Sequence, residues 1–148
     1  MHDACLGVSA MRPQRRKNAG FTLIELVVVV AILGFLVAIG IPRYMAARET
    51  AAANATKANL HNLAAAIELY LTEKSDLPGS LNDLVAAGYI GGIPKTPKGD
   101  NYTYARGSGL TYTISDPDIY TVGGSRYKYS VKEGGVIVEE QQQPQPTQ

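Results

Sequence analysis

The residue most suited to chemistry in this 148-residue chain is Glu25, a carboxylate in an apolar setting. Residues 21 to 41 carry no other charge, and the run ends at Pro42. At about 1.5 Å per residue, a helix over this run is about 31 Å long, close to the roughly 30 Å of bilayer hydrocarbon. An ionised side chain at mid-membrane costs about 2.5–3.5 kcal/mol. We therefore predict a membrane span in which Glu25 has a function and a neutralising partner.

Basic residues gather just before this span, at Arg12, Arg15, Arg16 and Lys17. The positive-inside bias places that end in the cytoplasm, so the bulk of the chain faces outward. After Gly20 the chain has ten basic and twelve acidic side chains, a composition that does not predict direct nucleic-acid binding.

The stretch Gly20-Phe21-Thr22-Leu23-Ile24-Glu25, behind a basic leader and ahead of Pro42, resembles the type IV pilin and pseudopilin superfamily. The resemblance implies cleavage between Gly20 and Phe21 by a prepilin peptidase, N-methylation of Phe21 and assembly into a helical homo-oligomeric filament. It also implies an assembly ATPase and an inner-membrane platform as partners. Met11 is a second candidate start, giving a ten-residue leader.

Cleavage would create an α-amine with a pKa of about 7.7–8.0, a natural partner for the Glu25 carboxylate. Residues 21 and 25 share one helix face, so a bond within one copy is the alternative to pairing between copies. We favour pairing between copies, because it would set the axial register of a filament. Gly34 and Pro42 should loosen the helix, either by local loss of helicity, as in related filaments, or by a kink where the chain leaves the membrane.

Beyond residue 43 the helical signals resume. Apolar residues at spacings of three and four predict a face that packs on a globular domain: Leu60, Leu63, Ala64, Ile67, Tyr70 and Leu71. Ser80 and Asp83 predict a capping box that starts a short second helix, stopped by Gly88. Alternating runs over 102–106, 110–115, 126–132 and 136–139 predict strands, with turns at 107–109, 116–124 and 133–135.

The expected fold is α+β and type IV pilin-like, with a long N-terminal helix packed on an antiparallel sheet of three or four strands. We divide the chain into a cleaved leader (1–20), a transmembrane and assembly half of the helix (21–42) and an amphipathic half (43–75). A globular head (76–140) and a disordered tail (141–148) complete it.

No catalytic residue, metal or cofactor is predicted. Asp100, Asp116 and Asp118 are interpreted as turn-forming residues rather than calcium ligands. His2 and His61 have no ligand cluster nearby in sequence, and Cys5, the only cysteine, allows no internal disulfide.

We predict a structural subunit of a bacterial type IV pilus, made as a single-pass inner-membrane prepilin with a cytoplasmic N-terminus. The alternative is a major pseudopilin of type II secretion, in a periplasmic pseudopilus. An alternative of another class is an uncleaved membrane anchor that displays a small binding domain. The absence of cysteines after the leader and the connector Ile93-Pro94-Lys95 favour a pseudopilin, whereas the polar tail and the few late acidic residues favour a pilus.

Overall fold

The computed structural model describes residues 20–143, and the chain divides into two compact units between Ala38 and Ile39. The predicted leader start, the basic cluster, His2 and Cys5 lie outside the described residues. Helix α1 (Leu23–Lys74) belongs to both units. The other elements are α2 (Leu81–Ala86), β1 (Thr103–Arg106), β2 (Tyr112–Val122), β3 (Ser125–Lys132), the 3-10 turn η1 (Glu133–Gly135) and β4 (Val136–Gln142).

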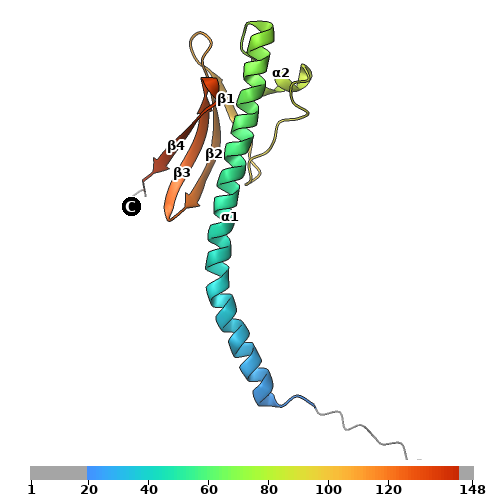
Figure 1. Cartoon of the computed structure of the whole chain (residues 1–148), viewed down its shortest axis with the longest axis vertical. Helices are drawn as coiled ribbons and strands as arrows, with labels where there is room; N and C mark the ends of the chain where they lie inside the picture. The colour runs from blue at the N-terminus through green and yellow to red at the C-terminus, as the bar shows by residue number, and fades with distance from the viewer. Residues whose placement is uncertain (1–19, 144–148) are drawn as a thin grey trace, which may run out of the picture. The chain divides into compact units, whose positions relative to one another are not determined.

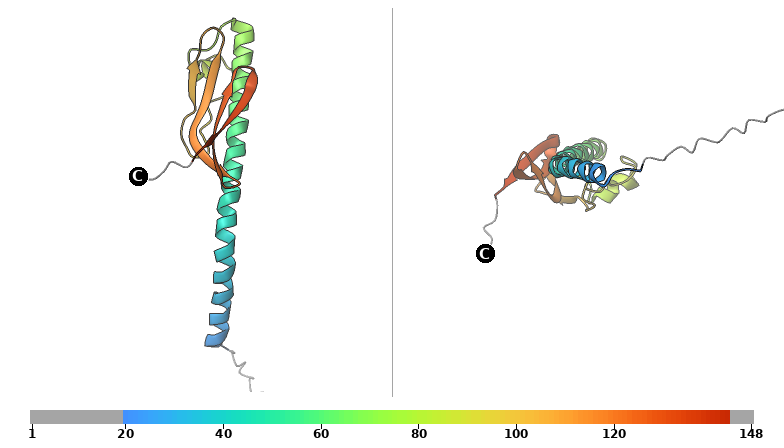
Figure 2. Two further views of the ribbon diagram at one scale, coloured as in Figure 1. Left: turned by 90° about the vertical axis from the view of Figure 1, so that its left-hand side faces the viewer. Right: turned by 90° about the horizontal axis from the view of Figure 1, so that it is seen from below.

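The second unit is a sheet packed on a helix. Its four strands are antiparallel and lie in the order β1-β2-β3-β4, each paired with its neighbour in sequence. Figures 1 and 2 show this sheet lying along the second half of α1. The α+β fold with a small antiparallel sheet is confirmed.

The core lies between this part of α1 and the inner face of the sheet. The helix contributes buried residues at spacings of three and four, as predicted: Ala53, Thr56, Leu60, Leu63, Ala64, Ala66 and Ile67. The sheet contributes Tyr112, Ile114, Tyr120, Tyr129 and Val131, all at most 1% exposed. Aromatic and β-branched residues suit such a half-buried pleated surface. The face predicted around Leu60 is therefore the one that holds the head.

Helix α2 begins at the predicted capping box. The Ser80 backbone N–H donates to the Asp83 carboxylate at 2.9 Å, and the Ser80 hydroxyl donates to the same group at 3.2 Å. The helix ends near Gly88, whose φ of +79° is a left-handed conformation that glycine adopts without strain. The short second helix is confirmed.

The predicted turn over 116–124 is wrong. Strand β2 continues to Val122, and its register with β3 shifts between Ser115 and Ile119. Pro117 lies within this irregularity, where a residue without an N–H does not interrupt a regular ladder. The actual turn lies at Gly123 and Gly124, both with positive φ. Asp116 and Asp118 therefore belong to a bulged strand and not to a loop.

The predicted tail also begins too early. Strand β4 extends to Gln142, with Gln141 opposite Tyr127 and Gln142 opposite Arg126. Pairing with β3 outweighs the polar composition that suggested disorder. Residues 144–148 of the predicted tail lie outside the described residues.

Candidate assembly site

Glu25 lies in the first turn of α1 and forms part of a helix cap. The backbone N–H of Thr22 donates to Glu25 Oε2 at 2.8 Å, and the Thr22 hydroxyl donates to the same oxygen at 2.7 Å. The Glu25 N–H donates to Thr22 Oγ1 at 3.3 Å. This is the reciprocal arrangement of a capping box. The spacing Thr-x-x-Glu is the signal in the sequence from which a role for Thr22 could have been predicted.

Both Thr22 bonds use the same carboxylate oxygen. Within the described residues, 20–143, Glu25 Oε1 accepts no hydrogen bond. A carboxylate oxygen with open lone pairs, on a helix surface, is available to a donor from outside the chain. The cap and an external partner for Glu25 are thus compatible.

The first half of α1 is a wholly exposed apolar surface. Phe21, just before the helix, is 90% exposed, and residues 23 to 38 are all exposed. Phe21, Ile24, Glu25, Val28 and Val29 border a shallow depression of about 340 Å³. In the described part of the chain, α1 is the one helix long and apolar enough to cross a membrane. Such a surface must be covered by lipid or by other protein.

The other predicted assembly residues lie on or beside this surface. Gly20 is exposed and precedes the helix, and α1 continues through Gly34 and Pro42 as a helix. A side chain at Gly34 would meet no atom within 4 Å. The structure brings Phe21 and Glu25 to one depression and places Gly34 and Pro42 further along the same helix.

A buried polar network joins α1 to the sheet in the second unit. Thr56 Oγ1 donates to Asp116 Oδ2 at 2.8 Å, and Tyr120 OH donates to the same oxygen at 2.9 Å. The Asp118 N–H donates to Asp116 Oδ1 at 2.8 Å. Burial raises the pKa of the Asp116 carboxyl, whereas the bonds from Asp118, Thr56 and Tyr120 oppose that shift. Asp116 thus has partners at both oxygens and serves as a structural group.

Further polar contacts attach the head near its other end. The carboxylate of Glu68 accepts bonds from Tyr112 OH at 2.9 Å and from the Gly134 N–H at 2.9 Å. Tyr89 OH donates to Glu73 at 2.5 Å, which raises the pKa of Tyr89 to about 12. No group of three or more His, Cys, Asp or Glu side chains in residues 20–143 could hold a metal ion.

A long helix that is apolar and exposed over its first half and carries a small antiparallel sheet on its second half is the architecture expected of a pilin-like subunit. Residues 15–41 match the family model of the prokaryotic N-terminal methylation motif. The chain is 32% identical to the type II secretion system core protein G of Pseudomonas aeruginosa, over 82% of this chain and 91% of that protein. The chain belongs to the type IV pilin and pseudopilin family.

Other relatives fall in the same two groups. The core protein G of Vibrio cholerae is 32% identical, over 73% of this chain and 82% of that protein. The type IV major pilin protein PilA of Myxococcus xanthus is 36% identical, over 60% of this chain and 36% of that protein. No solved structure gives a significant match. The family consists of structural subunits, so the chain is a filament subunit of the pilin and pseudopilin kind.

Proposed function

We propose that this chain is the major pseudopilin of a type II secretion system. The observation that carries the proposal is the length of the similarity, because the core protein G relative from Pseudomonas aeruginosa aligns over 91% of its own chain. Similarity of that extent includes the head as well as the helix.

The assembly mechanism begins with the leader. Hydrolysis of the peptide bond between Gly20 and Phe21 leaves a carboxylate on Gly20 and an amine on Phe21, which is then methylated. The new cation pairs with Glu25 of a neighbouring copy through Oε1, while Oε2 keeps its bonds to Thr22. This pairing neutralises both charges away from water, and it selects one axial register between copies.

The remaining apolar surface of the first half of α1 then leaves lipid for a bundle of identical helices. Gly34 and Pro42 lie where the helix must adapt, because glycine lacks a side chain and proline lacks an N–H. A cytoplasmic ATPase and an inner-membrane platform drive this transfer. In this mechanism residues 21–42 form the span, residues 43–75 form the amphipathic half of the helix, and residues 76–140 form the head. The chain itself catalyses no reaction.

A pilus subunit, the function predicted from the sequence alone, is the second candidate. Its support is the pilin PilA of Myxococcus xanthus, which is 36% identical over 88 residues. That match covers only 36% of the pilin's length, so it supports this assignment over a much smaller share of the relative than the match to the core protein G does.

The test is deletion of this chain in the bacterium that encodes it, with complementation by the intact chain. A pseudopilin deletion abolishes release of secreted proteins into the medium and leaves surface fibres intact. Loss of fibres with normal secretion would instead assign the chain to a pilus.

The mass of the mature protein tests the uncleaved anchor. We expect an N-terminus at Phe21 carrying one methyl group. Mature protein that retains the leader would overturn both filament assignments.

A further inference from the structure

Strand β1 is an edge of the sheet, and part of that edge is unpaired. The Gly107 N–H donates to the Thr111 carbonyl at 2.9 Å, which makes these residues a hydrogen-bonded pair. Bonded pairs alternate along an antiparallel ladder, so Ala105 also turns its backbone groups toward β2. The backbone N–H and C=O of Tyr104 and Arg106 therefore point to the open edge. No hydrogen bond within residues 20–143 occupies them.

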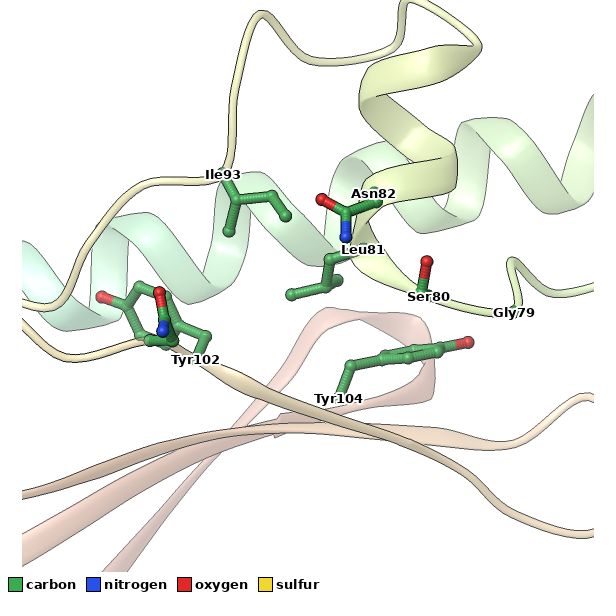
Figure 3. Close-up of a pocket in the computed structure, with 8 residues that line it drawn as sticks. Gly79, Ser80, Leu81, Asn82, Ile93, Tyr102 and Tyr104 are labelled. Atoms are coloured by element: carbon green, nitrogen blue, oxygen red, sulfur yellow. The ribbon is translucent and has the colours of Figure 1, made fainter.

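A pocket of about 420 Å³ lies beside this edge. Figure 3 shows Tyr102 and Tyr104 on the β1 side and Ser80, Leu81 and Asn82 on the α2 side. Ile93 and Asn101 also line it. Its wall thus combines apolar and ring surface with three hydroxyls and two amides. Such a wall suits a side chain that has an aliphatic stem and an amide end, as glutamine does.

A free edge next to a side-chain pocket is the arrangement that binds an extended peptide as an added strand. The main chain of the peptide pairs with the edge, and alternate side chains enter the pocket. A residue bonded to Tyr104 places its side chain on the same face of the sheet as Tyr104, which is the pocket side.

The end of this chain has the pattern that such an edge requires. After β4 it reads Gln143-Pro144-Gln145-Pro146-Thr147-Gln148. Backbone N–H groups alternate in direction along a strand. If the N–H groups of residues 143, 145 and 147 point toward β1, the backbone nitrogens of the two prolines, at the even positions between them, lie on the solvent side. A missing N–H costs no ladder bond there, and prolines at an outer edge prevent a further strand from adding.

The same copy cannot supply this segment. Strands β1 and β4 are opposite edges of the four-stranded sheet, about 14 Å apart at roughly 4.8 Å per strand. Gln145 follows the end of β4 by three residues, a reach of roughly 10 Å. The donor must be a second copy.

We propose that the segment 143–147 of one copy binds to a neighbouring copy as a strand added antiparallel to β1, with Gln145 opposite Tyr104 and its side chain in the pocket. The Gln145 amide then meets Asn82 and Asn101. This interaction rests on the proposed filament, because the filament brings copies together. It would link heads on the outside of a bundle that the apolar helices hold from within.

The test is binding of a fluorescein-labelled peptide of residues 140–148 to the full chain in detergent micelles, followed by anisotropy. We expect saturable binding. A Gln145→Pro peptide loses the N–H that pairs with β1 and the pocket side chain, so its affinity falls about tenfold or more. A Pro146→Gln peptide has its change on the solvent side and binds within about twofold of the parent.

Variants of the receptor provide a matched pair. Arg106→Pro removes an N–H that points to the open edge, whereas Arg106→Ala keeps it. Both lose the ion pair of Arg106 with Asp76 at 2.7 Å. We expect binding about tenfold weaker for the proline variant, and parent-like binding for the alanine variant. The peptide series requires no change in the receptor, so a folding defect in Arg106→Pro would not compromise the test.

Three results would overturn the proposal: no saturable binding, equal binding of all three peptides, or a larger loss for Pro146→Gln than for Gln145→Pro. The last would mean recognition of the prolines rather than strand addition. The proposed function is scored separately, by secretion after deletion of this chain in the encoding bacterium. Loss of secretion without peptide binding refutes the tail interaction alone, and peptide binding with normal secretion after deletion refutes the proposed function alone.

Discussion

The two halves of α1 are apolar in different ways. From Leu23 to Ala38 apolar residues fill nearly every position, so the helix has no polar face and none of its residues is buried within the chain. In the half that carries the head, buried residues recur at spacings of three and four from Ala53 to Ile67. A periodic stripe predicts one partner surface, whereas a uniform surface predicts an environment that surrounds the helix. The first half thus depends on lipid or other copies, and the second half on its own head.

The same contrast holds for two carboxylates. Asp116 is fully buried, and both its oxygens accept bonds from residues of the same copy. Glu25 is exposed, and among the bonds formed within residues 20–143 only its Oε2 accepts any, both from Thr22. A buried charge without full pairing would be costly, which explains the complete network at Asp116. The open oxygen of Glu25 lies on an exposed surface, where a donor from another molecule can reach it.

The largest effect is expected from Glu25→Ala. Removal of the carboxylate deletes the proposed partner of the Phe21 amine, so we expect filaments to fall at least about tenfold, as one lost charge pairing predicts. Near-ultraviolet circular dichroism of the head tyrosines should not change. Electron microscopy of filaments measures the first effect, and near-ultraviolet circular dichroism of the chain in micelles measures the second.

Glu25→Gln separates the two roles of this residue. Glutamine can keep the capping interaction with Thr22 but carries no charge. We expect it to assemble as poorly as the alanine variant. Full assembly of Glu25→Gln would mean that Glu25 serves as a helix cap, and the contrast between the two carboxylates would fail.

The second prediction concerns the periodic half. Leu60 is fully buried, so Leu60→Ala should lower the free energy of unfolding of the head by about 2–5 kcal/mol. Leu36 is 59% exposed, and Leu36→Ala should leave head unfolding unchanged. Urea unfolding of the full chain in micelles, followed by tyrosine circular dichroism, measures both. Equal destabilisation by the two substitutions would show that both halves of α1 pack on the head, and not the second half alone.

The third prediction tests the network at Asp116. Thr56→Val removes a hydroxyl that donates to the buried carboxylate, which should cost about 1–3 kcal/mol near pH 7. Burial raises the pKa of Asp116 in the folded protein, and the bond from Thr56 lowers it. Loss of this bond in the variant should therefore raise the folded-state pKa of Asp116 further. Stability linked to a raised pKa is present below the unfolded value and is lost as pH rises through the folded value.

The deficit of Thr56→Val should therefore be largest at neutral pH and shrink below about pH 4, the ordinary range of an unfolded aspartate. Unfolding of parent and variant at both pH values measures this change. Addition of Asp116→Asn should remove most of the pH dependence. A deficit independent of pH would mean that the hydroxyl stabilises the head by packing alone.

Local patterns account for most of what the sequence predicted. The motif at Gly20 and the stripe around Leu60 depend on neighbours in sequence, and the family and the helix face were predicted from them. Strand β2 was cut short at Asp116 because aspartate and proline disfavour strands locally. Beyond Asp116 the strand pairs again with β3, and Asp116 itself is bonded to Thr56, which lies 60 residues away in sequence. Such a partner leaves no local signal. The cap at Thr22 had a signal in its spacing to Glu25 and was missed.

The smallest effect is expected at the rim of the head. Lys57 Nζ lies 2.6 Å from a Glu139 oxygen and 4.9 Å from the centre of the Tyr129 ring. The bond to Glu139 raises the pKa of Lys57 above its ordinary value, so its stabilisation is present at neutral pH and is lost as pH rises through the folded pKa. The side chains remain 34% and 45% exposed, so Lys57→Met should cost only about 0.5 kcal/mol.

High salt should reduce this deficit, because exposed ion pairs are screened. The matched control is Lys128→Met on β3, since Lys128 forms no ion pair within residues 20–143 and should tolerate the change. Urea unfolding at low and high salt measures both variants. If Lys57→Met lowered the free energy of unfolding as much as Leu60→Ala does, this surface ion pair would stabilise the head as strongly as the buried face of α1 does. The head would then be held to α1 by charge as much as by apolar packing, and the two halves of the helix would no longer differ in the way proposed.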